Sequence, residues 1–263
     1  MKFSKILALL LICCYGAVAQ QPEKQPRRSY LKFNLISPKL NIYGVNYEYK
    51  LARNVSFVLN ASTRPMKQIP YGKQLDSLAK EGRVGVSTVD FKNIYVNEAH
   101  VSFLTIAPEI RVYFGRQKSK PYFGFFYQFE KINTSVPASL EVSYKNQVFL
   151  MKVPVDFDIR TSGGGIVFGK LFHLNKNFVI DVSLYTPHIG GAYRVNAKVE
   201  NPFLTGLNDT EKAFLKTKII DRFGLDTRYY DVVVNNQEAS IKNAVKVPYW
   251  GYRGLNISLG YHF

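Results

Sequence analysis

Cysteine is nearly absent from this chain, which has two cysteines in 263 residues. Both of them, Cys13 and Cys14, lie within residues 1–19, a segment that we predict to be removed on export. The mature chain then has no thiol, which excludes disulfide bridges, zinc sites with cysteine ligands and thiol nucleophiles. A chain free of cysteine is also suited to passage through an oxidising periplasm.

Long apolar runs are scarce as well. No stretch has the ~18 apolar residues in a row that a membrane-spanning helix requires. The main apolar run, residues 6–14, follows the basic pair Lys2 and Lys5 and precedes small residues at 17–19. This order is typical of a secretory signal, so we predict a signal peptide over residues 1–19.

A lipoprotein signal with Cys13 or Cys14 lipidated is the alternative, although Ile12 is not the small residue expected before such a cysteine. Export without a spanning helix leaves two classes of protein, a soluble secreted protein and a membrane-inserted β-barrel. The polar, proline-containing residues 20–28 predict a periplasmic tether. No linker divides residues 29–263, which we interpret as one barrel domain.

Histidine is rare too, and no catalytic or metal-binding pattern stands out. Asp181, Ser183 and His188 resemble a hydrolase set in composition, but all three lie along one predicted strand, so no neighbouring strand supplies the histidine. The glycines at 163–165 are not followed by Lys-Ser or Lys-Thr, which excludes a phosphate-binding loop. We therefore predict no catalytic, cofactor-binding or metal-binding residue and no enzyme activity. The four histidines, which show no metal-ligand spacing, are His100, His173, His188 and His262.

Acidic residues are outnumbered, with 19 Asp and Glu against 35 Lys and Arg, a formal net charge of +16. The long polar stretches are close to neutral, so the excess falls in the short connections, for example at Arg53, Lys120 and Lys176. Anionic lipid headgroups are the expected partner of this basic end. Nucleic acid is not expected, because aromatic and basic residues do not interleave.

What the chain has in abundance is strict alternation of apolar and polar residues. A strand with this pattern has one apolar and one polar face. The last residues resemble the closing strand of bacterial outer-membrane β-barrels, whose apolar face meets lipid while the polar face lines the interior. We interpret Leu259, Tyr261 and Phe263 as the assembly signal of such a strand. The alternating apolar residues are Leu255, Ile257, Leu259, Tyr261 and Phe263.

The same alternation predicts eight strands, joined by connections that are alternately short and long, as in bacterial barrels. The predicted fold is all-β, an eight-stranded antiparallel transmembrane β-barrel with long extracellular loops. The sequence also predicts a helix in the last loop, which Asn208 and Glu211 cap and Gly224 ends. A lipocalin-like secreted barrel, with its apolar face inside, is the alternative. The predicted strands cover residues 30–36, 43–51, 55–64, 104–114, 123–130, 157–174, 178–185 and a final strand ending at 263, and the long loops are residues 65–98, 134–155 and 196–248.

Charged residues on the polar faces are predicted to project into the barrel. Eight strands enclose an interior that side chains can fill. Charges in such a space must pair, since unpaired buried charges are costly. We therefore predict an ion-pair plug, with a gated path for protons or small ions as the alternative. The predicted interior charge network is Glu48, Lys50, Glu109, Arg111, Glu130 and Asp181.

Three short motifs carry a resemblance to a known family. They are Lys-Phe-Asn-Leu at 32–35, Ala-Pro-Glu-Ile-Arg-Val-Tyr-Phe at 107–114 and Pro-Tyr-Phe-Gly-Phe-Phe at 121–126. They resemble a family of outer-membrane barrels of unknown function that is common in Bacteroidetes, with an OmpA- or OmpX-like barrel. The resemblance implies an outer-membrane location and a barrel fold, and it brings no active site with it. The loops at 65–98 and 196–248 have no counterpart in it.

The hypothesis that follows is a non-enzymatic outer-membrane protein with a surface structural role or a ligand- or partner-binding role, in which the three long loops contact a surface protein or glycan. The alternatives are an outer-membrane enzyme that modifies lipid or peptide, and a small pore. We expect a monomer that interacts with outer-membrane lipids and the barrel assembly machinery. The sequence identifies no ligand for the loops.

Overall fold

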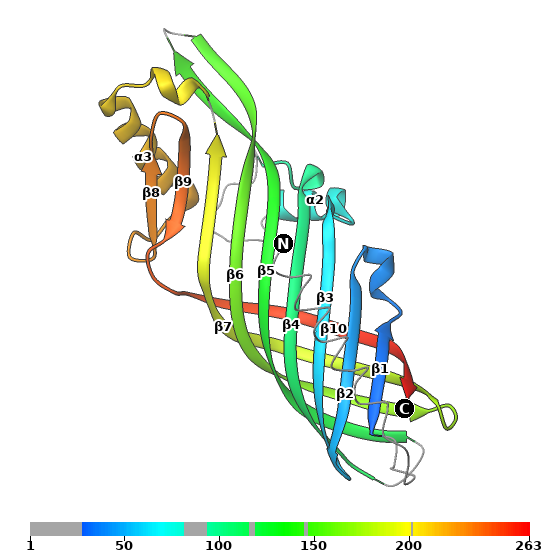
Figure 1. Cartoon of the computed structure of the whole chain (residues 1–263). Coiled ribbons are helices and arrows are strands. Elements are labelled where there is room, and N and C mark those ends of the chain that lie inside the picture. Colours follow the sequence, from blue (N-terminus) through cyan, green and yellow to red (C-terminus); the bar gives the residue numbers. More distant parts are fainter. Residues whose placement is uncertain (1–27, 82–93, 116–118, 145–146, 201) are drawn as a thin grey trace, which may run out of the picture.

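The computed structural model describes residues 28–81, 94–115, 119–144, 147–200 and 202–263. The described strands form one antiparallel sheet of ten strands. Eight of them close into a ring, because β10 pairs with both β1 and β7 (Figure 1). This closure confirms the predicted eight-stranded barrel. Among the described residues, no helix is long and apolar enough to cross a bilayer.

Each ring strand pairs with the ring strands that precede and follow it in sequence, so the ring is an up-and-down barrel. The predicted signal peptide, and the predicted tether apart from Arg28, lie outside the described residues. The ring strands are β1 (Ser29–Asn34), β2 (Tyr43–Ala52), β3 (Val55–Gln68), β4 (His100–Tyr113), β5 (Ser119–Tyr144), β6 (Gln147–His173), β7 (Phe178–Glu200) and β10 (Val247–His262).

The barrel is polar inside and apolar outside. On β4, Ile110 points outward and is 42% exposed, whereas its neighbours Glu109 and Arg111 point inward and are at most 1% exposed. The outward rows of the other ring strands are also apolar, with Phe125 on β5 and Leu184 on β7 among the exposed residues. A lipocalin-like barrel would have the reverse distribution. The observed one is that of a barrel that spans a lipid bilayer.

Aromatic side chains gather on the outer surface at the end of the ring that carries the short turns. Phe178 lies 5.6 Å from Tyr261 between ring centroids, and Tyr261 lies 6.3 Å from Phe263. Phe114 stacks on Phe123 at 5.6 Å. Such rings mark the membrane–water interface of barrels. The residues of the predicted assembly signal thus lie on the outer face, and their role in assembly stays a prediction.

The opposite end of the ring carries the ordered loop elements (Figure 1). The predicted helix of the last loop is present, with a complete capping box between Asn208 and Glu211 and a left-handed Gly224 at its end. A second α-helix lies in the connection between β3 and β4. The elements are η1 (Ser37–Leu40), α2 (Gly72–Lys80), η3 (Val96–Glu98), η4 (Pro202–Gly206), α3 (Asp209–Phe223), β8 (Tyr230–Val234) and β9 (Glu238–Asn243).

The strands are longer than predicted, so the loops are shorter. The segment 134–155 is a continuation of β5 and β6, which pair residue by residue up to Tyr144 and Gln147. The segment 196–248 begins as part of β7 and contains two strands that the sequence did not predict. In this segment β9 pairs with the end of β7, and β8 pairs with β9. Beyond Ala192, β10 no longer pairs with β7, and the strand edge left there pairs with β9.

Candidate functional site

Five charged side chains meet inside the ring with almost no exposed surface. We call Lys32, Glu48, Glu109, Arg111 and Asp181 the interior cluster; each is at most 1% exposed. They come from β1, β2, β4 and β7, so their contacts cross the lumen instead of following one strand.

Asp181 lies at the centre of the interior cluster. Its Oδ2 accepts hydrogen bonds from Lys32 Nζ at 2.6 Å and from Arg111 Nη1 at 2.5 Å. Its other oxygen accepts a hydrogen bond from the hydroxyl of Tyr122 at 2.7 Å. The Arg111 guanidinium also lies over the Tyr122 ring, 4.3 Å from its centroid. One carboxylate therefore holds both cations of the cluster.

Each of the two glutamates accepts hydrogen bonds from one cation and one tyrosine. Glu48 accepts from Lys32 Nζ at 2.5 Å and from the Tyr113 hydroxyl at 2.6 Å. Glu109 accepts from Arg111 Nε, and its Oε2 also accepts from the Tyr185 hydroxyl at 3.1 Å and from Asn60 Nδ2 at 2.9 Å. Buried charges are tolerated when they are both paired and hydrogen-bonded. Each charged side chain of the cluster is paired and hydrogen-bonded, and Arg111 Nη2 is its one nitrogen or oxygen atom that is buried without a hydrogen-bond partner.

The structure brings together four of the six predicted network residues, namely Glu48, Glu109, Arg111 and Asp181. Lys50 lies apart, with its ammonium 4.9 Å from the ring of Tyr30. Lys32 was missed, although the alternation with Leu31 and Phe33 on the outer face already indicates that it points inward. Glu130, the sixth predicted residue, also lies apart from the cluster and lines a separate cavity.

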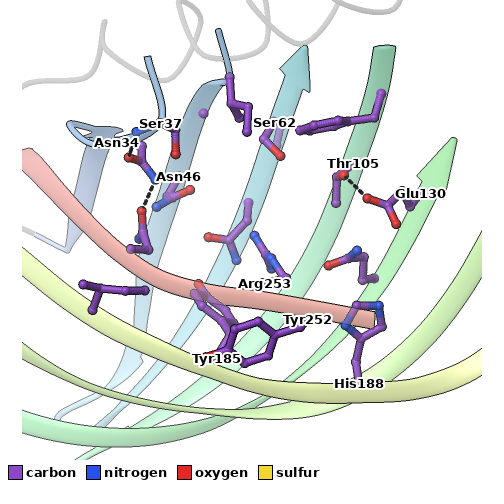
Figure 2. Close-up of a pocket in the computed structure, with 18 of the residues that line it drawn as sticks. Asn34, Ser37, Asn46, Ser62, Thr105, Glu130, Tyr185, His188, Tyr252 and Arg253 are labelled. Carbon is purple, nitrogen blue, oxygen red and sulfur yellow. Dashed lines mark hydrogen bonds between the residues drawn. The ribbon is translucent and has the colours of Figure 1, made fainter. Parts of the chain in front are cut away.

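That cavity occupies the lumen on the loop side of the interior cluster and has a volume of about 340 Å³. We call it the vestibule. Figure 2 shows Tyr185, His188 and Arg253 on one wall, and Asn34, Asn46, Thr105 and Glu130 on strands across from them. Glu130 accepts hydrogen bonds from Thr105 Oγ1 at 3.3 Å and Tyr249 OH at 3.5 Å. Asn60 and Tyr185, which bond to Glu109, form the boundary between the vestibule and the cluster.

Irregular strand geometry turns His188 and Arg253 into the vestibule. The register between β6 and β7 shifts between Gly164 and Val167, within and beside the glycine run. On β10, Gly254 has a φ of +71°, a conformation that glycine adopts readily. As a result, Arg253 turns inward and lies over the Tyr185 ring in the vestibule, whereas strict alternation with the exposed Leu255 would place it on the outer face. Strict alternation could not have predicted the inward positions of His188 and Arg253.

The residues of the considered hydrolase set have other partners. Asp181 belongs to the interior cluster, and Ser183 Oγ accepts a hydrogen bond from Asn256 Nδ2 at 3.2 Å. His188 lies in the vestibule, with its ring 6.0 Å from Phe126 and 5.9 Å from Tyr249 between centroids. Within the described ranges, no group of three or more His, Cys, Asp or Glu side chains could hold a metal ion.

Comparison with known proteins gives only distant similarities. No family model matches the chain, and no curated protein matches it. The chain is similar to the N-terminal β-barrel domain of Pseudomonas aeruginosa OprF, at 11% identity over 91% of this chain and 100% of that one, with a TM-score of 0.31. A major outer membrane protein from Thermus thermophilus is 8% identical over 91% and 100%, with a TM-score of 0.43. The outer membrane protease OmpT from Escherichia coli is 8% identical over 90% and 93%, with a TM-score of 0.38. The resemblance to the Bacteroidetes family therefore stays a prediction.

Proposed function

We propose that this protein is an integral barrel of the bacterial outer membrane whose lumen is sealed and whose role is to bind a surface protein or glycan through its loops. The proposal makes it a non-enzymatic protein. The observation that carries it is the division of the molecule into a lumen filled by paired charges and an opposite end built of ordered elements.

The sealed lumen argues against a pore. The interior cluster links β1, β2 and β4 to β7 across the ring, and tyrosines from β4, β5 and β7 cover its carboxylates. Opening a path through this cluster would separate buried opposite charges in a medium of low dielectric constant, which is costly.

The loop end is built in a way that suits binding. Its last loop contains a capped helix and a β-hairpin, and Val232 within the hairpin is 2% exposed. Connections of this length are usually functional or disordered, and a capped helix with a buried apolar residue beside it is not disordered. Phe214 on α3 is 65% exposed and Val233 on β8 is 41% exposed, so apolar contact area is available on this loop. The same elements could also serve as a lid over the vestibule.

Removing the last loop tests whether this loop is needed for binding or for folding of the barrel. Replacing residues 196–245 with a Gly-Asn-Gly turn joins β7 to β10 just beyond the pair Ala192–Val247 and leaves the ring contacts below it intact. We expect this variant to fold, as judged by heat-modifiable migration in electrophoresis. Cells that display it should lose binding to immobilised matrix proteins and glycans, which cells with the wild-type protein should show.

Two results would contradict this function. Cells with the wild-type protein that bind no probe above the level of vector-only cells would show that the loops do not act as a binding surface for these partners. Retained binding by the shortened variant would place the binding surface elsewhere. Failure of the variant to fold would show that the loop is part of the barrel fold itself.

A further inference from the structure

The vestibule has the features of a ligand site, which the binding role of the loops does not require. We propose that it binds a small, uncharged, hydroxyl-rich molecule of the size of one sugar ring. Its volume of about 340 Å³ lies at the lower end of the ~300–1,000 Å³ range of ligand pockets. At ~30 Å³ for each water molecule, the space corresponds to roughly eleven waters, enough for a single ring with some solvent.

Several residues that line this space carry a buried polar atom without a hydrogen-bond partner. Within the described part of the chain, Asn60 Oδ1, Gln128 Oε1 and both ring nitrogens of His188 make no hydrogen bond, and neither does Arg253 Nη1. Asn60, Gln128 and His188 are each 2% exposed. Buried polar groups are normally satisfied, so such a set calls for water or a ligand. It contains both donors and acceptors, and a hydroxyl group matches either kind because it donates and accepts.

The charges of the vestibule point to an uncharged ligand. The Glu130 carboxylate and the Arg253 guanidinium line the same cavity, so their charges cancel. Glu130 already accepts from Thr105 and Tyr249, and the Arg253 guanidinium lies over the Tyr185 ring, 4.3 Å from its centroid. The rest of the polar lining is neutral and rich in amides. The ring of Tyr249, which also lines the cavity, offers an aromatic surface to the apolar C–H edges of a sugar ring.

Glycines keep the room that His188 needs to face the vestibule. A Cβ on Gly251 would lie 2.5 Å from His188 Cε1, and one on Gly163 would lie 3.2 Å from His188 Cδ2. A Cβ on Gly165 would lie 3.2 Å from His188 Cβ and 2.8 Å from the Phe126 ring. The glycines at 163 and 165 on β6 and at 251 on β10 therefore leave the space that the buried imidazole of His188 occupies.

Calorimetry on the full-length protein tests this inference. The micelles should be of an amine-oxide detergent, because glycoside detergents carry sugar headgroups that would compete. We expect glucose, galactose or N-acetylglucosamine to bind at one site per chain, and glycine and inorganic phosphate not to bind. Gln128→Leu should weaken sugar binding by at least about tenfold, since it removes an unpartnered buried acceptor at nearly constant volume.

Phe129→Leu is the matched control, because Phe129 is adjacent in sequence but 49% exposed on the outer face. It should leave the dissociation constant within about twofold. If Gln128→Leu does not refold, Arg253→Met supplies the same test. The inference is overturned if none of the three sugars binds, if glycine or phosphate binds instead, or if the vestibule variant binds as tightly as wild type. The loop-shortened protein should keep sugar binding, which separates this site from the surface function.

Discussion

Replacing Arg111 with methionine is expected to lower the free energy of unfolding of the barrel by about 3–5 kcal/mol. Arg111 is fully buried and bonds to Glu109 and Asp181, with Glu48 at 3.7 Å. Without it, three buried carboxylates share the single ammonium of Lys32. Urea unfolding of the protein in lipid vesicles, followed by the fluorescence of its one tryptophan, Trp250, measures the change.

The charge count of the interior cluster predicts that removing an acidic side chain lowers the free energy of unfolding less than removing a basic one. The cluster has three carboxylates and two cations, so Asp181→Asn leaves two charges of each sign. We expect this variant to lose only about 1–2 kcal/mol, mainly from weakened hydrogen bonds. Lys198→Met, in an exposed pair with Glu200, is the control and should cause no measurable change. Equal losses for Arg111→Met and Lys198→Met would show that the cluster does not stabilise the barrel.

Replacing Leu184 with arginine is expected to destabilise the inserted barrel by about 2–4 kcal/mol, because the charge enters the middle of the apolar belt. Leu184 lies on the outer face of β7 between Leu255 of β10 and Phe168 of β6. The cost arises only in lipid. A water-soluble barrel would tolerate an arginine on its surface.

Tyr193→Arg is the matched control for this prediction. Tyr193 is on the same strand and is 50% exposed, the same fraction as Leu184. It lies further toward the loop end by nine residues, about 30 Å along the strand. With a strand tilt of about 45° this is roughly 21 Å along the membrane normal, more than half the height of an apolar belt about 25 Å tall, so Tyr193 falls outside the belt. We expect it to cost about 0–1 kcal/mol. If the two arginine variants unfold at the same urea concentration, the outer face of β7 does not meet lipid.

Alternation in the sequence was enough to predict the ring strands, because a strand between lipid and a polar lumen must alternate at nearly every position. Glu48, Glu109, Arg111 and Asp181 could be assigned to the interior on that basis. Lys32 could have been, since the outward Leu31 and Phe33 flank it.

Other features depended on contacts that no local pattern contains. The inward positions of His188 and Arg253 result from irregularities on β6, β7 and β10, and a single displaced residue reverses which face a side chain occupies. The hairpin of β8 and β9 forms by pairing with the end of β7, a contact between segments about forty residues apart. The three valines at 232–234 are visible in the sequence, but they do not reveal the pairing partner of their strand.

The most direct measurement of the central claim, a sealed barrel with its function at the loop end, is conductance in planar lipid bilayers. Purified wild-type protein should give little steady current, because the interior cluster and its tyrosines fill a lumen that eight strands make narrow. Large, stable, stepwise currents from the wild-type protein would contradict the claim and establish a pore.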